Sequence, residues 1–111
     1  MKNNEGYVAI NYIDCQEDYK SRFEELFSTT KRAIDEMPGF RFMRVLKPEN
    51  NEGSYLIVSF WDSREAFENW KGSEAFLEGH KRGFQDVIDA KRQGKEAPMT
   101  SDFKTYIVLT D

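Results

Sequence analysis

The chain has 111 residues, 14% of them aromatic and 32% charged, and a net charge of −4. This length favours one domain over residues 1–111, with enough aromatic side chains for a core. The acidic balance argues against a nucleic-acid partner, and no apolar run approaches the ~20 residues of a membrane span. The single cysteine, Cys15, excludes an internal disulfide. We therefore expect a soluble, cytoplasmic protein that binds neither nucleic acid nor membrane.

The first half of the chain contains three strand patterns and one helix pattern. Residues 6–14 alternate in the manner of a strand, with Asn11 on the same face as Ala9 and Ile13. Residues 15–37 carry apolar side chains at steps of three and four, which predicts one amphipathic helix that ends at Pro38-Gly39. Residues 40–46 and 54–61 are two β-rich runs around the turn sequence KPENNEG, which predicts a hairpin.

The second half of the chain contains two helix patterns and a last strand. Asp62 followed by Glu65 resembles a capping box at the start of a short helix, residues 63–70. Gly72 and Ser73 interrupt the pattern, and Ser73 is a candidate N-cap for a second helix that ends near residue 91. Residues 92–101 are polar and predict a loop, and residues 102–110 alternate as a final strand.

The predicted order β-α-β-β-α-β is that of a ferredoxin-like α+β fold. Helices cover only one face of such a sheet. Because most of the strands carry apolar residues on both faces, the other face needs a cover as well. We therefore expect a homodimer in which two sheets face each other.

The only histidine, His80, lies between Gly79 and Gly83 in the last predicted helix. It falls on the same face as Phe76 and Phe84, so it is either a core histidine with a hydrogen-bond partner or a metal ligand beside an apolar pocket. Each glycine costs a helix about 1 kcal/mol relative to alanine. The loss of two side chains beside a histidine would leave a flat surface that a planar group could approach.

Two further polar or aromatic residues have open interpretations. Asn11 is an amide inside a strand, either satisfied within the fold or directed into a cavity. Trp70 precedes the break at Gly72, so helical periodicity does not place it relative to His80, whereas Trp61 at a strand end is expected in the core. The basic residues that follow His80 could form a solvated helix end or bind anionic substituents of a ligand. The chain contains no G-x-G-x-x-G sequence and no P-loop.

These motifs resemble a known family. The sequence MPGF after the first helix, the hairpin that ends in SFWDSREAFENW, and SEAFLEGH together resemble the antibiotic biosynthesis monooxygenase (ABM) superfamily, from about residue 7 to residue 110. The combination of Asn11, Trp70 and His80 is more specific, because it is similar to the IsdG-type heme-degrading monooxygenases.

The resemblance implies a dimeric α+β barrel with one heme pocket in each subunit, between the helices and the sheet. His80 matches the axial ligand of the heme iron, Asn11 the distal residue that hydrogen-bonds to the ligand of the iron, and Trp70 the bulky side chain that distorts the macrocycle. The other residues expected to contact heme are Phe27, Phe76, Gly83 and Phe84, and the two glycines are expected to leave clearance for the porphyrin edge. Thr30 stands where relatives often carry an arginine that binds propionate, and Lys31 or Arg32 could replace it.

The resemblance also implies an activity. Heme would be cofactor and substrate of a monooxygenase that opens the porphyrin ring with O₂ and frees iron, with electrons from an unidentified external reductase. Two alternatives stay open. One is a cofactor-free ABM monooxygenase that oxidises an aromatic or quinol metabolite, and the other is a non-catalytic heme carrier.

Overall fold

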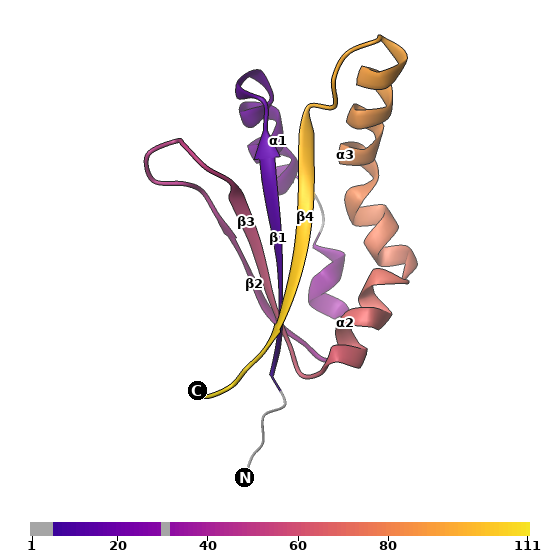
Figure 1. Cartoon of the computed structure of the whole chain (residues 1–111). Helices are drawn as coiled ribbons and strands as arrows, with labels where there is room; N and C mark the ends of the chain where they lie inside the picture. The colour runs from indigo at the N-terminus through magenta and orange to yellow at the C-terminus, as the bar shows by residue number, and fades with distance from the viewer. Residues whose placement is uncertain (1–5, 30–31) are drawn as a thin grey trace.

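The computed structural model describes residues 6–29 and 32–111, and an antiparallel sheet forms its centre (Figure 1). Its strands are β1 (Tyr7–Cys15), β2 (Phe40–Leu46), β3 (Tyr55–Trp61) and β4 (Met99–Ile107), in the spatial order β2-β3-β1-β4. The helices α1 (Lys20–Thr29), α2 (Arg64–Lys71) and α3 (Glu74–Arg92) lie on one side of this sheet. This arrangement confirms the predicted ferredoxin-like α+β fold.

The two faces of the sheet differ in burial because side chains alternate along each strand. On the central strand β1, the side chains of Tyr7, Ala9, Asn11 and Ile13 are buried beneath the helices, and those between them are only partly buried. Trp61 of β3 is fully buried in the same layer, as its position at a strand end predicted. The core therefore lies between the helices and one face of the sheet.

The predicted long helix over residues 15–37 is wrong in its extent. A 3-10 turn, η1 (Glu17–Tyr19), leads into α1, and a separate 3-10 turn, η2 (Ala33–Glu36), follows it. The hydroxyls of Ser28 and Thr29 donate to the carbonyl oxygen of Glu25 at 3.0 and 2.8 Å. Such side-chain bonds compete with the helical bonds of the last turn. Residues 30 and 31 lie outside the described residues, and the described part of α1 ends at Thr29.

The start of α2 also differs from the prediction. Ser63 is the N-cap, since its hydroxyl accepts a hydrogen bond from the backbone N–H of Ala66 at 3.2 Å. Asp62, the predicted cap, instead pairs with Arg41 on β2 at 2.7 Å. The prediction for α3 is confirmed, because the Ser73 hydroxyl accepts from the N–H of Phe76 at 3.1 Å.

The last strand begins three residues before the predicted start and ends three before the predicted end. The backbone N–H of Gln16 donates to the carbonyl oxygen of Pro98 at 2.9 Å, and pairing then continues from Cys15 opposite Met99. Residues 99–101 join the sheet because they provide hydrogen-bond partners for the backbone of the last residues of β1, Ile13 to Cys15. This register places Phe103 opposite Asn11. No helix in the described ranges is long and apolar enough to cross a membrane.

Candidate functional site

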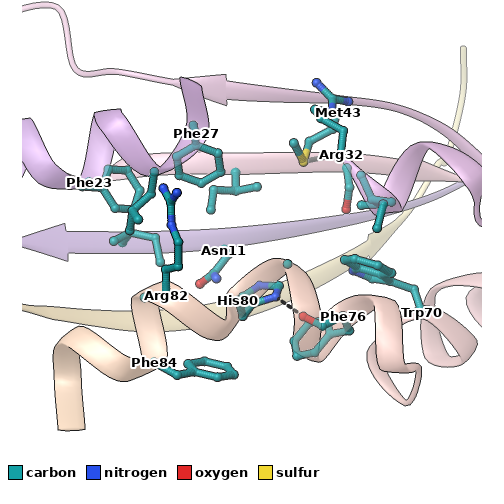
Figure 2. A pocket seen from close by; sticks show the side chains of 18 of the residues that line it. Asn11, Phe23, Phe27, Arg32, Met43, Trp70, Phe76, His80, Arg82 and Phe84 are labelled. Atoms are coloured by element: carbon teal, nitrogen blue, oxygen red, sulfur yellow. Dashed lines mark hydrogen bonds between the residues drawn. The ribbon is translucent and has the colours of Figure 1, made fainter. Parts of the chain in front are cut away.

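A cavity lies between α3, α1 and the buried face of the sheet (Figure 2). It brings together side chains from β1, α1, α2 and α3 that are far apart in the sequence. Every residue that the sequence analysis assigned to the site lines this cavity: Asn11, Phe27, Trp70, Phe76, His80, Gly83 and Phe84. The structure thus gathers the predicted residues in one place, while their roles toward a ligand stay predictions.

His80 is held by its own helix in one tautomer. Its Nδ1 lies 2.6 Å from the carbonyl oxygen of Phe76, one turn earlier on α3 (Figure 2). A carbonyl can only accept, so Nδ1 carries the proton and the lone pair is on Nε2. Burial lowers the pKa of His80, and the bond to Phe76 opposes this only in part. The imidazole is therefore neutral near pH 7, which is the form that binds a metal.

Aromatic rings extend on both sides of the imidazole along α3. The ring of Phe76 stacks on it with centroids 4.1 Å apart, and that of Phe84 lies at 5.5 Å. Phe84 is 45% exposed, so this face of α3 is not closed into a core. The apolar surroundings of His80 consequently continue to the rim of the cavity.

The side-chain amide of Asn11 is buried on the central strand β1, where asparagine is uncommon. Its side chain is 8% exposed, and its Oδ1 has no hydrogen-bond partner among the described residues. A buried carbonyl oxygen without a partner costs about 1–3 kcal/mol. Because Asn11 also lines the cavity, this cost is typical of a group that a ligand satisfies.

Trp70 belongs to the core and to the cavity at once. It is 7% exposed, and its ring lies against Trp61 and Phe76, with centroid distances of 6.4 and 5.4 Å. The distance to the imidazole of His80 is 6.4 Å. The close packing of these two rings against Trp70 leaves its side chain little freedom to move when a ligand binds.

The two glycines beside His80 have different surroundings. A Cβ atom at Gly79 would meet no heavy atom within 4 Å, so there is open space beside it. At Gly83, a Cβ atom would lie 3.2 Å from Cε of Met99 and 3.9 Å from Cδ1 of Leu26. The expected clearance at Gly83 is therefore wrong, since Gly83 allows α3 to pack closely against β4 and α1. Only Gly79 retains free space on the cavity side.

The structure describes one of the two residues that were predicted to replace a propionate-binding arginine. Thr30 and Lys31 lie outside the described residues. Arg32 lines the cavity, and its guanidinium donates to the carboxylate of Asp35 at 2.8 Å. A second arginine in the wall, Arg82, was noted in the sequence only as part of a basic group. It lies three residues after Gly79, so both belong to one flank of α3.

The composition of the cavity limits its chemistry. Its wall is mainly aromatic and aliphatic, and its polar side chains are one neutral imidazole, one unpartnered amide, two arginines and the hydroxyl of Ser59. Within the part of the chain that the structure describes, no three potential metal ligands form a cluster.

The ferredoxin-like α+β fold encloses a mainly apolar cavity between its helices and its sheet, and comparison with known proteins identifies its family. The family model for the antibiotic biosynthesis monooxygenases matches residues 6–82, and the chain belongs to this family. The family predicted from the sequence motifs is thereby confirmed.

Two relatives from Mycobacterium tuberculosis concern heme. The chain is 29% identical over 102 residues to a heme oxygenase (mycobilin-producing), an alignment that covers 81% of this chain and 97% of that protein. The solved structure of the heme-degrader MhuD with two hemes bound in its active site is 26% identical, with a TM-score of 0.68. That match covers 95% of this chain and 97% of the other.

A third similar structure has another chemistry. SnoaB from Streptomyces nogalater, described as a cofactor-independent oxygenase, is 20% identical with a TM-score of 0.70, over 96% of each chain. At this identity the likeness concerns the fold alone. The fold thus serves oxygenases of both kinds, and the side chains of the cavity have to distinguish between them.

Proposed function

We propose that the protein is a heme-degrading monooxygenase that binds heme in this cavity and opens the porphyrin ring with O₂ and external electrons, releasing iron. The observation that carries the proposal is the hydrogen bond from His80 to Phe76, which leaves Nε2 unprotonated beside an aromatic cavity. The similarity to a heme oxygenase at 29% identity supports it. A cofactor-free oxygenase would not need an imidazole prepared in this way.

The residues of the cavity suit a heme. His80 would bind the iron through Nε2, and the rings of Phe27, Phe76 and Phe84 would contact the apolar macrocycle. Bound heme would supply both the iron centre at which O₂ reacts and the ring that is oxidised. The unpartnered amide of Asn11 would hydrogen-bond to groups on the ligand.

Trp70 would act as a positioning residue. Because Trp61, which does not line the cavity, packs against it, the ring of Trp70 can press on a macrocycle instead of moving aside. Pressure of this kind would bend the porphyrin and bring one of its meso carbons closer to the oxygen that attacks it. Such positioning is a recognised source of rate enhancement.

Titration with ferric heme tests the proposal. The wild-type protein should give a Soret band that saturates at one heme per chain, and His80→Ala should abolish or strongly shift this band. Addition of ascorbate or a reductase should then bleach the band and deliver iron to a chelator. Circular dichroism of His80→Ala should show an intact fold, so that the loss of the band reports on the ligand.

Three results would contradict the proposal, and each has its own meaning. A Soret band that His80→Ala leaves unchanged would show that His80 is not the iron ligand. A saturable complex that never bleaches, and that passes heme to an acceptor protein, would indicate a carrier. A protein that ignores heme yet consumes O₂ with a quinol would indicate a cofactor-free monooxygenase.

The proposal includes an assembly and an electron donor. Residues 1–111 would form one ABM domain, and two chains would pair through the sheet face that the helices leave uncovered, to give the dimeric barrel. The chain has neither the dinucleotide-binding G-x-G-x-x-G sequence nor a P-loop. Electrons would therefore come from a separate reductase.

A further inference from the structure

Arg82 reaches from α3 toward α1 across the cavity. Figure 2 shows its side chain directed at Phe27. Its Nη2 donates a hydrogen bond to the Thr29 hydroxyl at 2.6 Å, which joins the last residue of α1 to the helix that carries His80. A ligand that binds between Phe27 and His80 would therefore meet this guanidinium.

Arg82 forms no ion pair within 4 Å among the described residues, although its charge helps to lower the pKa of Asp86. Asp86, one turn further along α3, receives its hydrogen bonds from Tyr19 at 2.6 Å and from Arg22 at 3.0 Å. Among the residues that the structure describes, the one side-chain hydrogen bond of Arg82 goes to a neutral hydroxyl, although a guanidinium has five N–H donors. Four of its donors thus stay available for an anionic partner.

The second arginine of the wall differs in this respect. Arg32 is already paired with Asp35 at 2.8 Å, so a ligand would have to compete with that carboxylate. The partners of the two arginines therefore distinguish them, although both are exposed at the rim of the cavity.

We propose that Arg82 is the residue that binds a carboxylate of the ligand, and that it releases Thr29 to do so. This inference rests on the proposed function, because heme carries two propionate carboxylates beside an apolar ring. A guanidinium binds a carboxylate through two parallel hydrogen bonds, which a neutral hydroxyl cannot match. Arg82 would thus fix the orientation of the ring above His80.

A comparison of two porphyrins tests this role. Dissociation constants are measured from the Soret band and from quenching of tryptophan fluorescence, for ferric heme and for its dimethyl ester in the same cosolvent. Arg82→Ala should weaken binding of the free acid about tenfold and leave that of the ester unchanged. Arg82→Gln, which retains length and a donor for Thr29, should behave like Arg82→Ala.

Two control variants separate a ligand contact from a structural effect. Arg32→Ala should cause a smaller loss than Arg82→Ala, because Arg32 is held by Asp35. Thr29→Val removes the bond between the helices but leaves the guanidinium free, so the free acid should bind it at least as well as it binds the wild type. Thermal unfolding of each variant checks the fold.

The possible failures are distinguishable. If the wild-type protein binds neither porphyrin, the proposed function fails and this inference fails with it. If heme binds but Arg82→Ala weakens both porphyrins equally, or weakens neither, only the role of Arg82 is overturned. A loss of affinity in Thr29→Val that equals the loss in Arg82→Ala would also overturn it, because the effect would then come from the tie between the helices.

Discussion

His80 and Phe76 are joined by a hydrogen bond of 2.6 Å between Nδ1 and a backbone carbonyl of the same helix. This bond decides which nitrogen of the imidazole carries the proton, and it does so without any help from a ligand. The stacking of Phe76 on the same ring, at 4.1 Å, restrains its orientation as well. A single turn of α3 thus fixes the tautomer of His80 and leaves the lone pair on Nε2, the form of imidazole that can bind a metal.

The first prediction concerns the protonation of His80. Because burial lowers its pKa below the ordinary 6.5, the imidazole should titrate below pH 6.5 in the folded protein. The chain has one histidine, so NMR of the imidazole gives one signal to follow, and its nitrogen shifts should show the proton on Nδ1. Heme affinity should be constant from pH 8 to about 6.5 and fall at lower pH.

The same shift has a consequence for stability. Below pH 6.5 the unfolded chain binds the proton more readily than the folded chain, so acidification through this range should lower the free energy of unfolding. His80→Ala should remove this part of the pH dependence. A titration midpoint of the His80 imidazole at or above pH 6.5 would contradict the lowered pKa. Nitrogen shifts that place the proton on Nε2 would contradict the tautomer assigned from the bond to Phe76.

The second prediction compares the two tryptophans. Trp70→Phe should slow heme degradation about tenfold, because the smaller ring presses less on the macrocycle, while heme affinity changes little. Trp61→Phe is the matched control, since Trp61 is fully buried but does not line the cavity. Each substitution should cost about 1–2 kcal/mol of unfolding free energy. Equal turnover in the two variants would show that Trp70 is only a core residue.

The sequence predicted the order of elements because the signals for them are local. The alternation around Asn11 and the cap at Ser73 depend on neighbouring residues only, and the structure retains both. The 3-10 turns η1 and η2 were missed because their residues continue the apolar spacing of a helix, and periodicity alone does not distinguish a 3-10 turn from an α-helix. The limits of β4 were missed because its pairing with β1 is not local.

The site was predictable as a set of residues but not as a geometry. The face of α3 that carries Phe76, His80 and Phe84 follows from helical periodicity. The position of Trp70 beside His80 does not, because Gly72 and Ser73 separate their helices. The difference between Gly79 and Gly83 also depends on a distant residue, Met99, which only the folded chain brings close.

The third prediction concerns the oligomeric state. The sheet face away from the helices carries large apolar side chains, among them Phe42, which is 40% exposed and stacks on Phe60 at 4.2 Å. We expect a dimer through this face, and Val58→Lys, at the centre of the sheet opposite Ile10, should give a monomer in sedimentation experiments. Leu77→Lys on α3 should stay dimeric. A monomeric wild-type protein would contradict the dimeric barrel.

The fourth prediction concerns a polar cluster that joins α1 and η1 to α3. Burial raises the pKa of Asp86. The hydrogen bonds from Arg22 and Tyr19, together with the charges of Arg22 and Arg82, lower it by more than burial raises it, so the pKa lies below its ordinary value. A carboxylate with a lowered pKa adds stability above its ordinary pKa, and this stability is lost as the pH falls through the lowered value. The cluster should therefore stabilise the fold at neutral pH but not in strong acid.

Asp86→Ala tests this cluster. It should lower the free energy of unfolding by about 2 kcal/mol at pH 7, because the buried Tyr19 hydroxyl and Arg22 lose a charged acceptor. The difference from the wild type should shrink below pH 4. Asp89→Ala is the control, since Asp89 is exposed and its carboxylate accepts a hydrogen bond from Gln85 at 2.9 Å. A difference that stays constant down to pH 2 would exclude a contribution from the charge of Asp86.

The last prediction separates the two glycines beside His80. Gly79→Leu should weaken heme binding about tenfold or more, because its side chain enters the free space in the cavity, while the better helix propensity stabilises the fold by about 1 kcal/mol. Gly83→Leu should lower both stability and heme affinity, because it meets Met99 and Leu26. Gly79→Ala, with only a Cβ, should gain stability and still bind heme. If Gly79→Leu binds heme as the wild type does, heme does not occupy the space beside Gly79, and the ring must enter from the side of Phe84.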